Sequence, residues 1–242
     1  MFDCCRDTNA ILRATRFRKT LTAAVSAVIV AACTSAPPTI DQSGEVTFDG
    51  LYPVANSKSD EAWARPGIDI SQYNKILLQG AGIEFRPGGE SGKTWSARSR
   101  GGPYEVTERQ KEALSSIIAE AFVKALAESE HFELTNTPGP DVLLVRGKLL
   151  DVVSYVPPET TGVRDAVFIS KVGEATLVLE LRDSITETIL ARAVDRRAAE
   201  ASTGIGLQES NRVRNASEVR RLAQVWARRL REQLDTYGAP NP

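Results

Sequence analysis

The sequence predicts an α+β domain, with a largely antiparallel sheet, two long amphipathic helices packed on one face of it, and a disordered N-terminal signal and tether. Two stretches, near residues 107–129 and 216–237, carry apolar residues at helical spacing. Four other stretches read as strands, and the last two of these are joined by a short turn. The 242 residues, 42% hydrophobic and 25% charged, are typical of one folded domain.

The first predicted strand covers residues 75–85, KILLQGAGIEF. Its apolar side chains favour a strand, and Gly80 and Gly82 indicate a bulge or an edge. Residues 87–103 follow, rich in glycine and without apolar periodicity, which predicts an exposed loop. The sequence leaves open whether this loop is functional or merely disordered.

A helix is predicted over residues 107–129. Thr107 and Gln110 have the spacing of a capping box, in which the side chain of each residue accepts a hydrogen bond from the backbone N–H of the other. The apolar residues recur every three or four positions, so this helix has one face for a core, while Glu112 and Lys124 belong to a polar face.

Three strands and a second helix are expected after it. The strands begin at Asp141, Lys171 and Thr188, and the short link at residues 184–187 predicts an antiparallel hairpin between the last two. The helix is expected over residues 216–237 with Asn215 as its N-cap. Arginines on its outer face are interpreted as solvated and balanced by nearby acids.

The N-terminus has the layout of a secretory signal. Four basic residues between positions 13 and 19 precede an uncharged run at residues 21–32. As a helix, 12 residues would reach roughly 18 Å, which is well short of the roughly 30 Å of a bilayer's hydrocarbon core. The run therefore predicts a cleaved signal and not a membrane span.

The end of this run, Val30-Ala31-Ala32-Cys33, resembles the lipobox of bacterial lipoproteins. The resemblance implies that a diacylglycerol is attached to the Cys33 sulfur, that the chain is cleaved before Cys33, and that the new amino group is acylated, for example with palmitate. Two or three acyl chains hold a protein firmly at a membrane. Because Thr34 follows in place of an aspartate, the analogy favours the periplasmic face of the outer membrane over the inner membrane.

The domain organisation follows from this cut. Residues 1–32 are predicted to be a lipoprotein signal peptide, residues 33–45 a flexible tether rich in Ser, Thr, Pro and Gly, and residues 46–238 a single periplasmic α+β domain. Cys4 and Cys5 leave with the signal, so Cys33 is the one thiol of the mature chain.

Several chemistries find little support in the sequence. The mature chain has 25 basic and 29 acidic residues, which gives no basic patch for nucleic acid. GGESGKT lacks the first glycine of a nucleotide-binding loop, since that position is Pro87. His131, the one histidine, is interpreted as capping the end of the preceding helix by interacting with its last carbonyls. Glu159 and Asp165 could serve as an acid and a base, but among 29 mature acids such a pair does not indicate an active site. We expect no catalytic residue, metal or cofactor.

The ordered segments FDGLYP, RPGIDISQYNKILL, PGPDVLLV, ELRDSITETILAR and WARRL, from residue 48 to residue 230, resemble a bacterial lipoprotein family of unknown function, DUF3313. The hairpin departs from the family pattern, which often has glycine where this chain has Glu187. The resemblance implies an envelope address and an α+β fold, and it names no activity.

The sequence thus favours a lipid-anchored binding or interaction module of the cell envelope without catalytic activity. The membrane, through Cys33, is the expected partner, and an unidentified envelope protein is a second one. A periplasmic hydrolase acting on glycan or peptide, and a purely structural tethered protein, remain alternatives. A concave site with converging polar groups would favour the enzyme, and an apolar patch or open sheet edge would favour the module.

Overall fold

Ten strands and two helices make up the described part of the chain in a computed structural model, which covers residues 36–86, 103–157, 168–200 and 207–239. Their bounds are β1 Thr39–Ile40, β2 Tyr52–Ala55, β3 Glu61–Ala64, β4 Lys75–Phe85, α2 Glu108–Leu126, β5 Glu133–Thr135, β6 Val142–Ser154, β7 Phe168–Ile169, β8 Lys171–Asp183, β9 Ile189–Glu200, β10 Gln208–Glu209 and α3 Arg212–Gly238.

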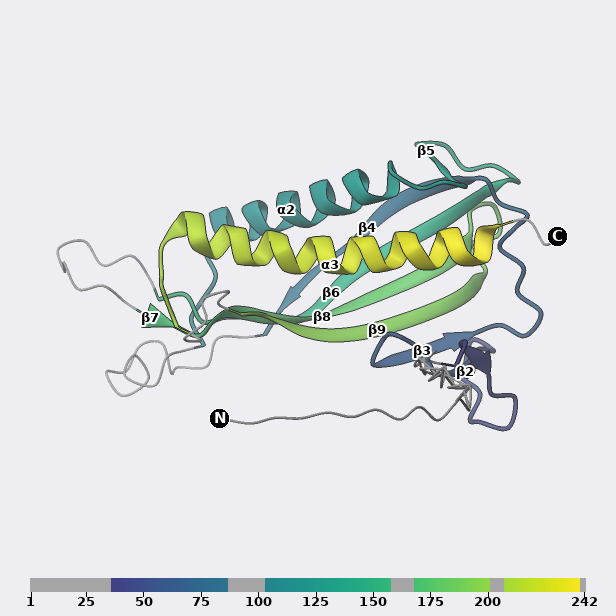
Figure 1. The fold of residues 1–242 in the computed structure, drawn as a ribbon, viewed down its shortest axis with the longest axis horizontal. Coiled ribbons are helices and arrows are strands. Elements are labelled where there is room, and N and C mark those ends of the chain that lie inside the picture. The colour runs from purple at the N-terminus through teal and green to yellow at the C-terminus, as the bar shows by residue number, and fades with distance from the viewer. Residues whose placement is uncertain (1–35, 87–102, 158–167, 201–206, 240–242) are drawn as a thin grey trace, which may run out of the picture. The chain divides into compact units, whose positions relative to one another are not determined.

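Eight of these strands form one sheet, in the order β1-β2-β3-β9-β8-β6-β4-β5, and β7 pairs with β10 in a second, two-stranded sheet. The long strands β6, β8 and β9 form the antiparallel centre of the eight-stranded sheet (Figure 1). The short strands β1, β2 and β3 extend it from the outer edge of β9, where Glu61–Ala64 pairs with residues 191–194.

Strand β4 is parallel to both of its neighbours, β5 and β6. The chain leaves the end of β4 and returns through α2, whose 19 residues span about 28 Å along the helix axis. A return of this length places the next strands beside β4 in the same direction, as parallel pairing requires.

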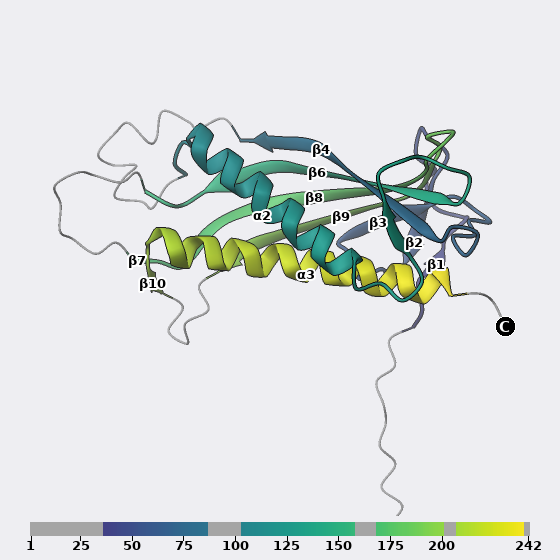
Figure 2. The same cartoon turned by 90° about the horizontal axis from the view of Figure 1, so that it is seen from above.

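The core lies between the sheet and the helices. Helices α2 and α3 contact each other, α3 also contacts β8 and β9, and α2 reaches the sheet at β4 (Figure 2). The main cluster of buried apolar side chains includes Ile76, Phe122, Leu126, Leu143, Val145, Leu177, Trp226, Leu230 and Leu234. No helix in the described ranges is long and apolar enough to cross a membrane.

Several predicted elements are confirmed. Strand β4 has the expected bounds, and its register shifts between Gly80 and Ile83, where a bulge was expected. Thr107 is the N-cap of α2, and its capping box with Gln110 is present. Strands β8 and β9 form the predicted antiparallel hairpin, in which Glu187 adopts a left-handed conformation with φ 55°. That φ is one that a glycine adopts at no cost.

The predicted fold class is wrong as stated. It counted four strands, all long, and missed β1, β2, β3, β5, β7 and β10. The parallel pairing of β4 was not foreseen, and of the two helices only α3, with 27 residues, is long. The helices do not lie on the sheet as an equivalent pair, since α2 meets it at β4 and packs mainly on α3. Strand β1 also lies inside residues 33–45, the predicted disordered tether.

The predicted start of α3 is also corrected. The helix begins at Arg212, and Asn211 is its N-cap, because the Asn211 side chain accepts a hydrogen bond from the backbone N–H of Arg214. Asn215, the predicted cap, is buried one turn inside the helix. Both positions hold the same residue type four positions apart, so the sequence alone does not separate them.

Candidate functional site

Most residues that the sequence singled out as candidates lie outside the described ranges. These include Cys33, the pair Glu159 and Asp165, and all but Pro103 of the predicted loop. Lipid attachment at Cys33 therefore stays a prediction. In the described part of the chain, no group of three or more His, Cys, Asp or Glu side chains could hold a metal ion.

His131 does not act as the sequence suggested. Within the described structure, the last turn of α2 is closed by the backbone N–H groups of Ala127, Glu128 and Ser129, which donate to carbonyls of that turn. The Ser129 hydroxyl then accepts the N–H groups of His131 and Phe132 and donates to Asp235 of α3. A serine, and not the histidine ring, thus organises this helix end.

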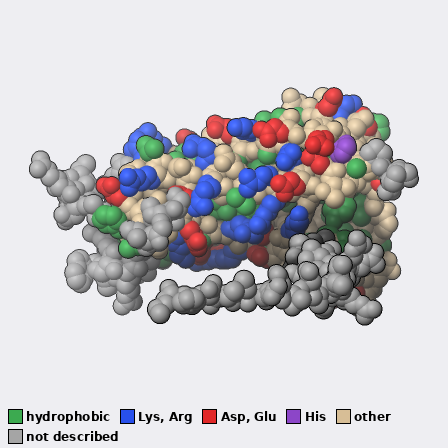
Figure 3. Space-filling model, viewed as in Figure 1, with side chains coloured by type: hydrophobic (Ala, Val, Ile, Leu, Met, Phe, Trp, Pro, Cys, Tyr) green, Lys and Arg blue, Asp and Glu red, His purple; other side chains and the backbone are tan. Residues whose placement is uncertain are grey.

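The charge balance expected for α3 is only partly present, because the helix has seven arginines against three acids, Glu218, Glu232 and Asp235. Lys and Arg side chains lie interspersed with Asp and Glu on this side of the molecule (Figure 3). Arg221 pairs with Glu218 at 2.7 Å, Arg228 with Glu232 at 4.0 Å and Arg231 with Asp235 at 3.6 Å. These pairs with acids of the same helix involve three of its seven arginines.

The outer edge of β4 is the first part of a candidate binding site. Strand β5 covers only its beginning, from Lys75 to Leu77, and no strand in the described structure pairs with this edge from Leu78 to Phe85. A Cβ atom built on Gly80 or Gly82 meets no atom within 4 Å. Backbone groups at an uncovered edge are free to pair with another chain, and glycines allow that chain to approach closely.

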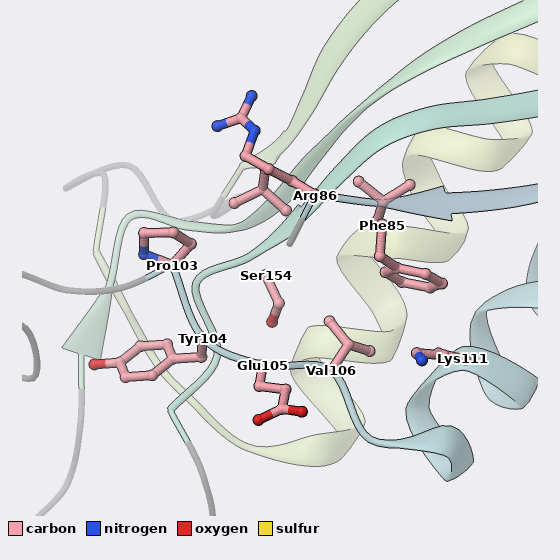
Figure 4. A pocket seen from close by; sticks show the side chains of 10 residues that line it. Phe85, Arg86, Pro103, Tyr104, Glu105, Val106, Lys111 and Ser154 are labelled. Atoms are coloured by element: carbon pink, nitrogen blue, oxygen red, sulfur yellow. The ribbon is translucent and has the colours of Figure 1, made fainter. Parts of the chain in front are cut away.

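A pocket of about 180 Å³ at the end of β4 is the second part. Phe85 and Val106 contribute apolar wall, Ser154 contributes a hydroxyl, and Glu105 and Lys111 bring opposite charges (Figure 4). The pocket lies where β4 stops pairing with β6. Beyond that point Tyr104 pairs with β6 in place of β4, and its backbone N–H donates to the Ser154 carbonyl at 2.8 Å. We call the open edge and this pocket together the β4 site.

An ion-pair cluster begins at Arg86, which lines the pocket. Arg86 donates two hydrogen bonds to Asp151, which has a φ of 53° and also binds Arg196 at 2.8 Å. Arg196 in turn binds Glu174 at 3.0 Å. Hydrogen bonds from Arg86 and then from Arg196 lower the pKa of the Asp151 carboxyl to about 2. Asp151 is thus a charged anchor at neutral pH and not a proton donor.

Two polar groups of the pocket, Lys111 and Ser154, already have partners. Lys111 pairs with Glu108 at 2.7 Å and lies over the Phe85 ring, and the Ser154 hydroxyl accepts the Val156 N–H at 3.2 Å. Within the described structure no base lies within hydrogen-bond reach of Ser154, which a serine nucleophile would need. The arrangement therefore suits binding of a chain along an edge, with one side chain in the pocket.

The sequence held part of the signal for this site. Gly80 and Gly82 marked β4 as a bulged or edge strand, and that reading is confirmed. The pocket gave no signal, because Tyr104 and Ser154 are 50 positions apart and meet only where the two strands separate.

The chain belongs to the DUF3313 family, described as proteins of unknown function, because the family model matches residues 41–230. The sequence-based family assignment is thereby confirmed. No curated protein matches the chain.

Solved structures are similar to the chain only distantly. Protein XCC0632 from Xanthomonas campestris is 10% identical over 72% of this chain and 90% of that chain, with a TM-score of 0.42. A PelC dodecamer from Paraburkholderia phytofirmans is 12% identical over 74% and 96%, with a TM-score of 0.32. Protein CT253 from Chlamydia trachomatis is 12% identical over 69% and 99%, with a TM-score of 0.36. At these scores the likenesses carry no argument about function.

Proposed function

We propose that this protein is a lipid-anchored protein of the cell envelope, whose folded domain binds an extended segment of an envelope partner at the β4 site. The anchor rests on the basic and apolar signal followed by Val30-Ala31-Ala32-Cys33. A diacylated Cys33 would keep the domain at the periplasmic face of the outer membrane, with the first described residue, Ala36, three positions away.

The observation that carries the binding function is the open edge of β4. An added strand obtains its affinity from main-chain hydrogen bonds to such an edge and its specificity from pockets that take alternate side chains. Here the glycines leave room for the added backbone. The pocket of about 180 Å³ beyond Phe85 has room for one side chain of that strand.

The lining of the pocket is mixed. Phe85, Val106, Val152 and Val153 contribute apolar wall, and Glu105 and Ser154 contribute polar groups. Lys111 and Arg86 are already paired, with Glu108 and Asp151. The proposed partner segment is therefore extended, with one side chain that reaches the pocket.

The anchor is tested by intact mass and by flotation of membranes from cells that express the full chain. We expect the wild-type mass to correspond to residues 33–242 plus the acyl groups, and the Cys33→Ser chain to carry no lipid and to leave the membrane fraction. Equal masses and equal locations for the two chains would contradict the anchor.

Binding is tested by photo-crosslinking in cells, with a photoreactive amino acid in place of Gln79 and, as a matched control, in place of Asn136. Gln79 is an exposed residue of β4, and Asn136 is exposed beyond β5, so neither replacement disturbs the core, and Gly80 and Gly82 are kept. We expect a defined adduct from position 79 only, mapping to one extended segment of the partner. The same adducts from both positions, or cleavage of an envelope substrate without any adduct, would overturn the proposal.

A further inference from the structure

A tight turn at residues 47–50 holds an aromatic side chain out of the fold. The Gly50 N–H donates to the Thr47 carbonyl at 2.9 Å, so Phe48 occupies the second position of a β-turn. Its side chain is 97% exposed, and Val46 beside it is 44% exposed. Phenylalanine is not a residue that this turn position favours, and in water its ring has no compensating contact here.

The turn is rigid, so the exposure of Phe48 is built into the backbone. The Thr47 hydroxyl accepts the Leu51 N–H at 3.0 Å, and Gly50 takes a φ of 79° that favours glycine. Arg65 donates to the Asp49 carbonyl at 3.0 Å, and Arg192 of β9 forms an ion pair with the Asp49 carboxylate. Leu51, the next residue, is fully buried. These contacts hold the backbone of residues 47–50 in the turn that presents Phe48 to solvent.

The turn lies in the part of the described domain that is nearest in sequence to Cys33. Residues 41–51 connect β1 to β2, and β1 pairs with β2 directly, Thr39 opposite Ala55. An extended chain advances at most about 3.6 Å per residue, so the three steps from Cys33 to Ala36 cover about 11 Å. A lipid on Cys33 would thus hold the β1–β2 segment close to the bilayer surface.

We propose that Phe48 and Val46 insert into the surface of the membrane that carries the lipid anchor. The inference rests on the proposed anchor at Cys33. Aromatic and aliphatic side chains bind at the boundary between head groups and acyl chains, where they leave water. The charges of the turn do not oppose this for zwitterionic lipid, because Arg192 and Arg65 offset Asp49. The short chain between Cys33 and β1 favours lipid over a second copy or a soluble partner as the occupant.

A paramagnetic depth measurement on single-cysteine variants tests this contact. The mature chain has no free thiol once Cys33 is lipidated, so Phe48→Cys gives a unique site for a nitroxide label. The matched control is Phe168→Cys in β7, also an exposed phenylalanine, at 61%. Both lipidated full-length chains are reconstituted into phosphatidylethanolamine and phosphatidylcholine vesicles and floated, and label collisions with oxygen and with a water-soluble relaxant are compared.

We expect the label at position 48 to collide several times more with oxygen than with the water-soluble relaxant, and the label at position 168 to behave as in solution. If both labels remain water-accessible on floated vesicles, the membrane contact is refuted while the anchor stands. If the label at position 48 is immobilised, in a concentration-dependent way, in a soluble chain that also carries Cys33→Ser, a second copy is the occupant and the proposal falls. A chain that does not float overturns the anchor and this inference together.

Discussion

The bond between Trp226 of α3 and Asp195 of β9 offers a direct test of what fastens the long helix to the sheet. The indole N–H donates to the Asp195 carboxylate at 2.7 Å, and both residues are nearly fully buried, at 4% and 6% exposure. Arg197 binds the same carboxylate. Replacing Trp226 with phenylalanine removes the donor while an aromatic ring remains in the core.

The expected cost of Trp226→Phe is about 3 kcal/mol of unfolding free energy. Loss of a hydrogen bond to a charged group costs about 1.5–3 kcal/mol. The smaller ring leaves a void of about 40 Å³, which at ~24 cal/mol per Å³ adds about 1 kcal/mol. The matched control is Trp63→Phe in β3, which is the same chemical change at a half-buried tryptophan whose indole has no hydrogen bond to any described residue. It should cost less than about 1 kcal/mol.

Urea unfolding of the mature chain carrying Cys33→Ser, followed by far-ultraviolet circular dichroism, measures both costs. With a slope of about 2 kcal/mol per molar urea, Trp226→Phe should lower the midpoint by about 1.5 M. An unchanged slope would indicate that the denatured state is unaltered. If Trp226→Phe cost no more than Trp63→Phe, the reasoning that this buried bond fastens α3 to β9 would be refuted.

Three further predictions concern other contacts. The lowered pKa of Asp151 makes its folded-state contribution present at neutral pH and lost as pH falls from about 5 toward 2, so Asp151→Asn should flatten the acid branch of a stability–pH curve. A curve of unchanged steepness would exclude this role. Gly238→Ala should destabilise by about 1–3 kcal/mol, since its Cβ would lie 2.4 Å from the Phe132 ring, whereas Gly80→Ala should be nearly neutral; equal thermal midpoints would contradict this. Burial, and then the bond to Asp183, raises the pKa of Tyr73 to about 12, so an ultraviolet titration should show one late-ionising tyrosine that Tyr73→Phe removes. Its persistence in that variant would reject the assignment.

Local patterns predicted those elements whose signal lies within one stretch of chain. The capping box at Thr107 and the strand at Lys75–Phe85 depend on residues a few positions apart, and both have the expected form. The hairpin of β8 and β9 is likewise set by a short link. The family assignment also followed from the order of segments along the chain.

Distant pairing decided what the sequence did not reveal. Strands β2 and β3 have four residues each and no alternating pattern, so they become strands only because the edge of β9 provides partners for them. Whether Asn211 or Asn215 caps α3 depends on which of them is buried against the rest of the domain. An isolated stretch carries no information about such partners, because its hydrogen bonds are completed by residues a hundred positions away.

The same division holds for the two proposed contact surfaces. The sequence by itself determined the candidate anchor at Cys33, because the signal and the lipobox are read as contiguous residues. It also marked β4 as an edge or bulged strand through its glycines. Only the tertiary structure decided that no described strand pairs with this edge beyond Leu77, that a pocket opens where β4 and β6 separate, and that Phe48 is exposed. Each of these depends on which distant strands and side chains take up the space around it, and packing fixes that only when the whole domain is formed.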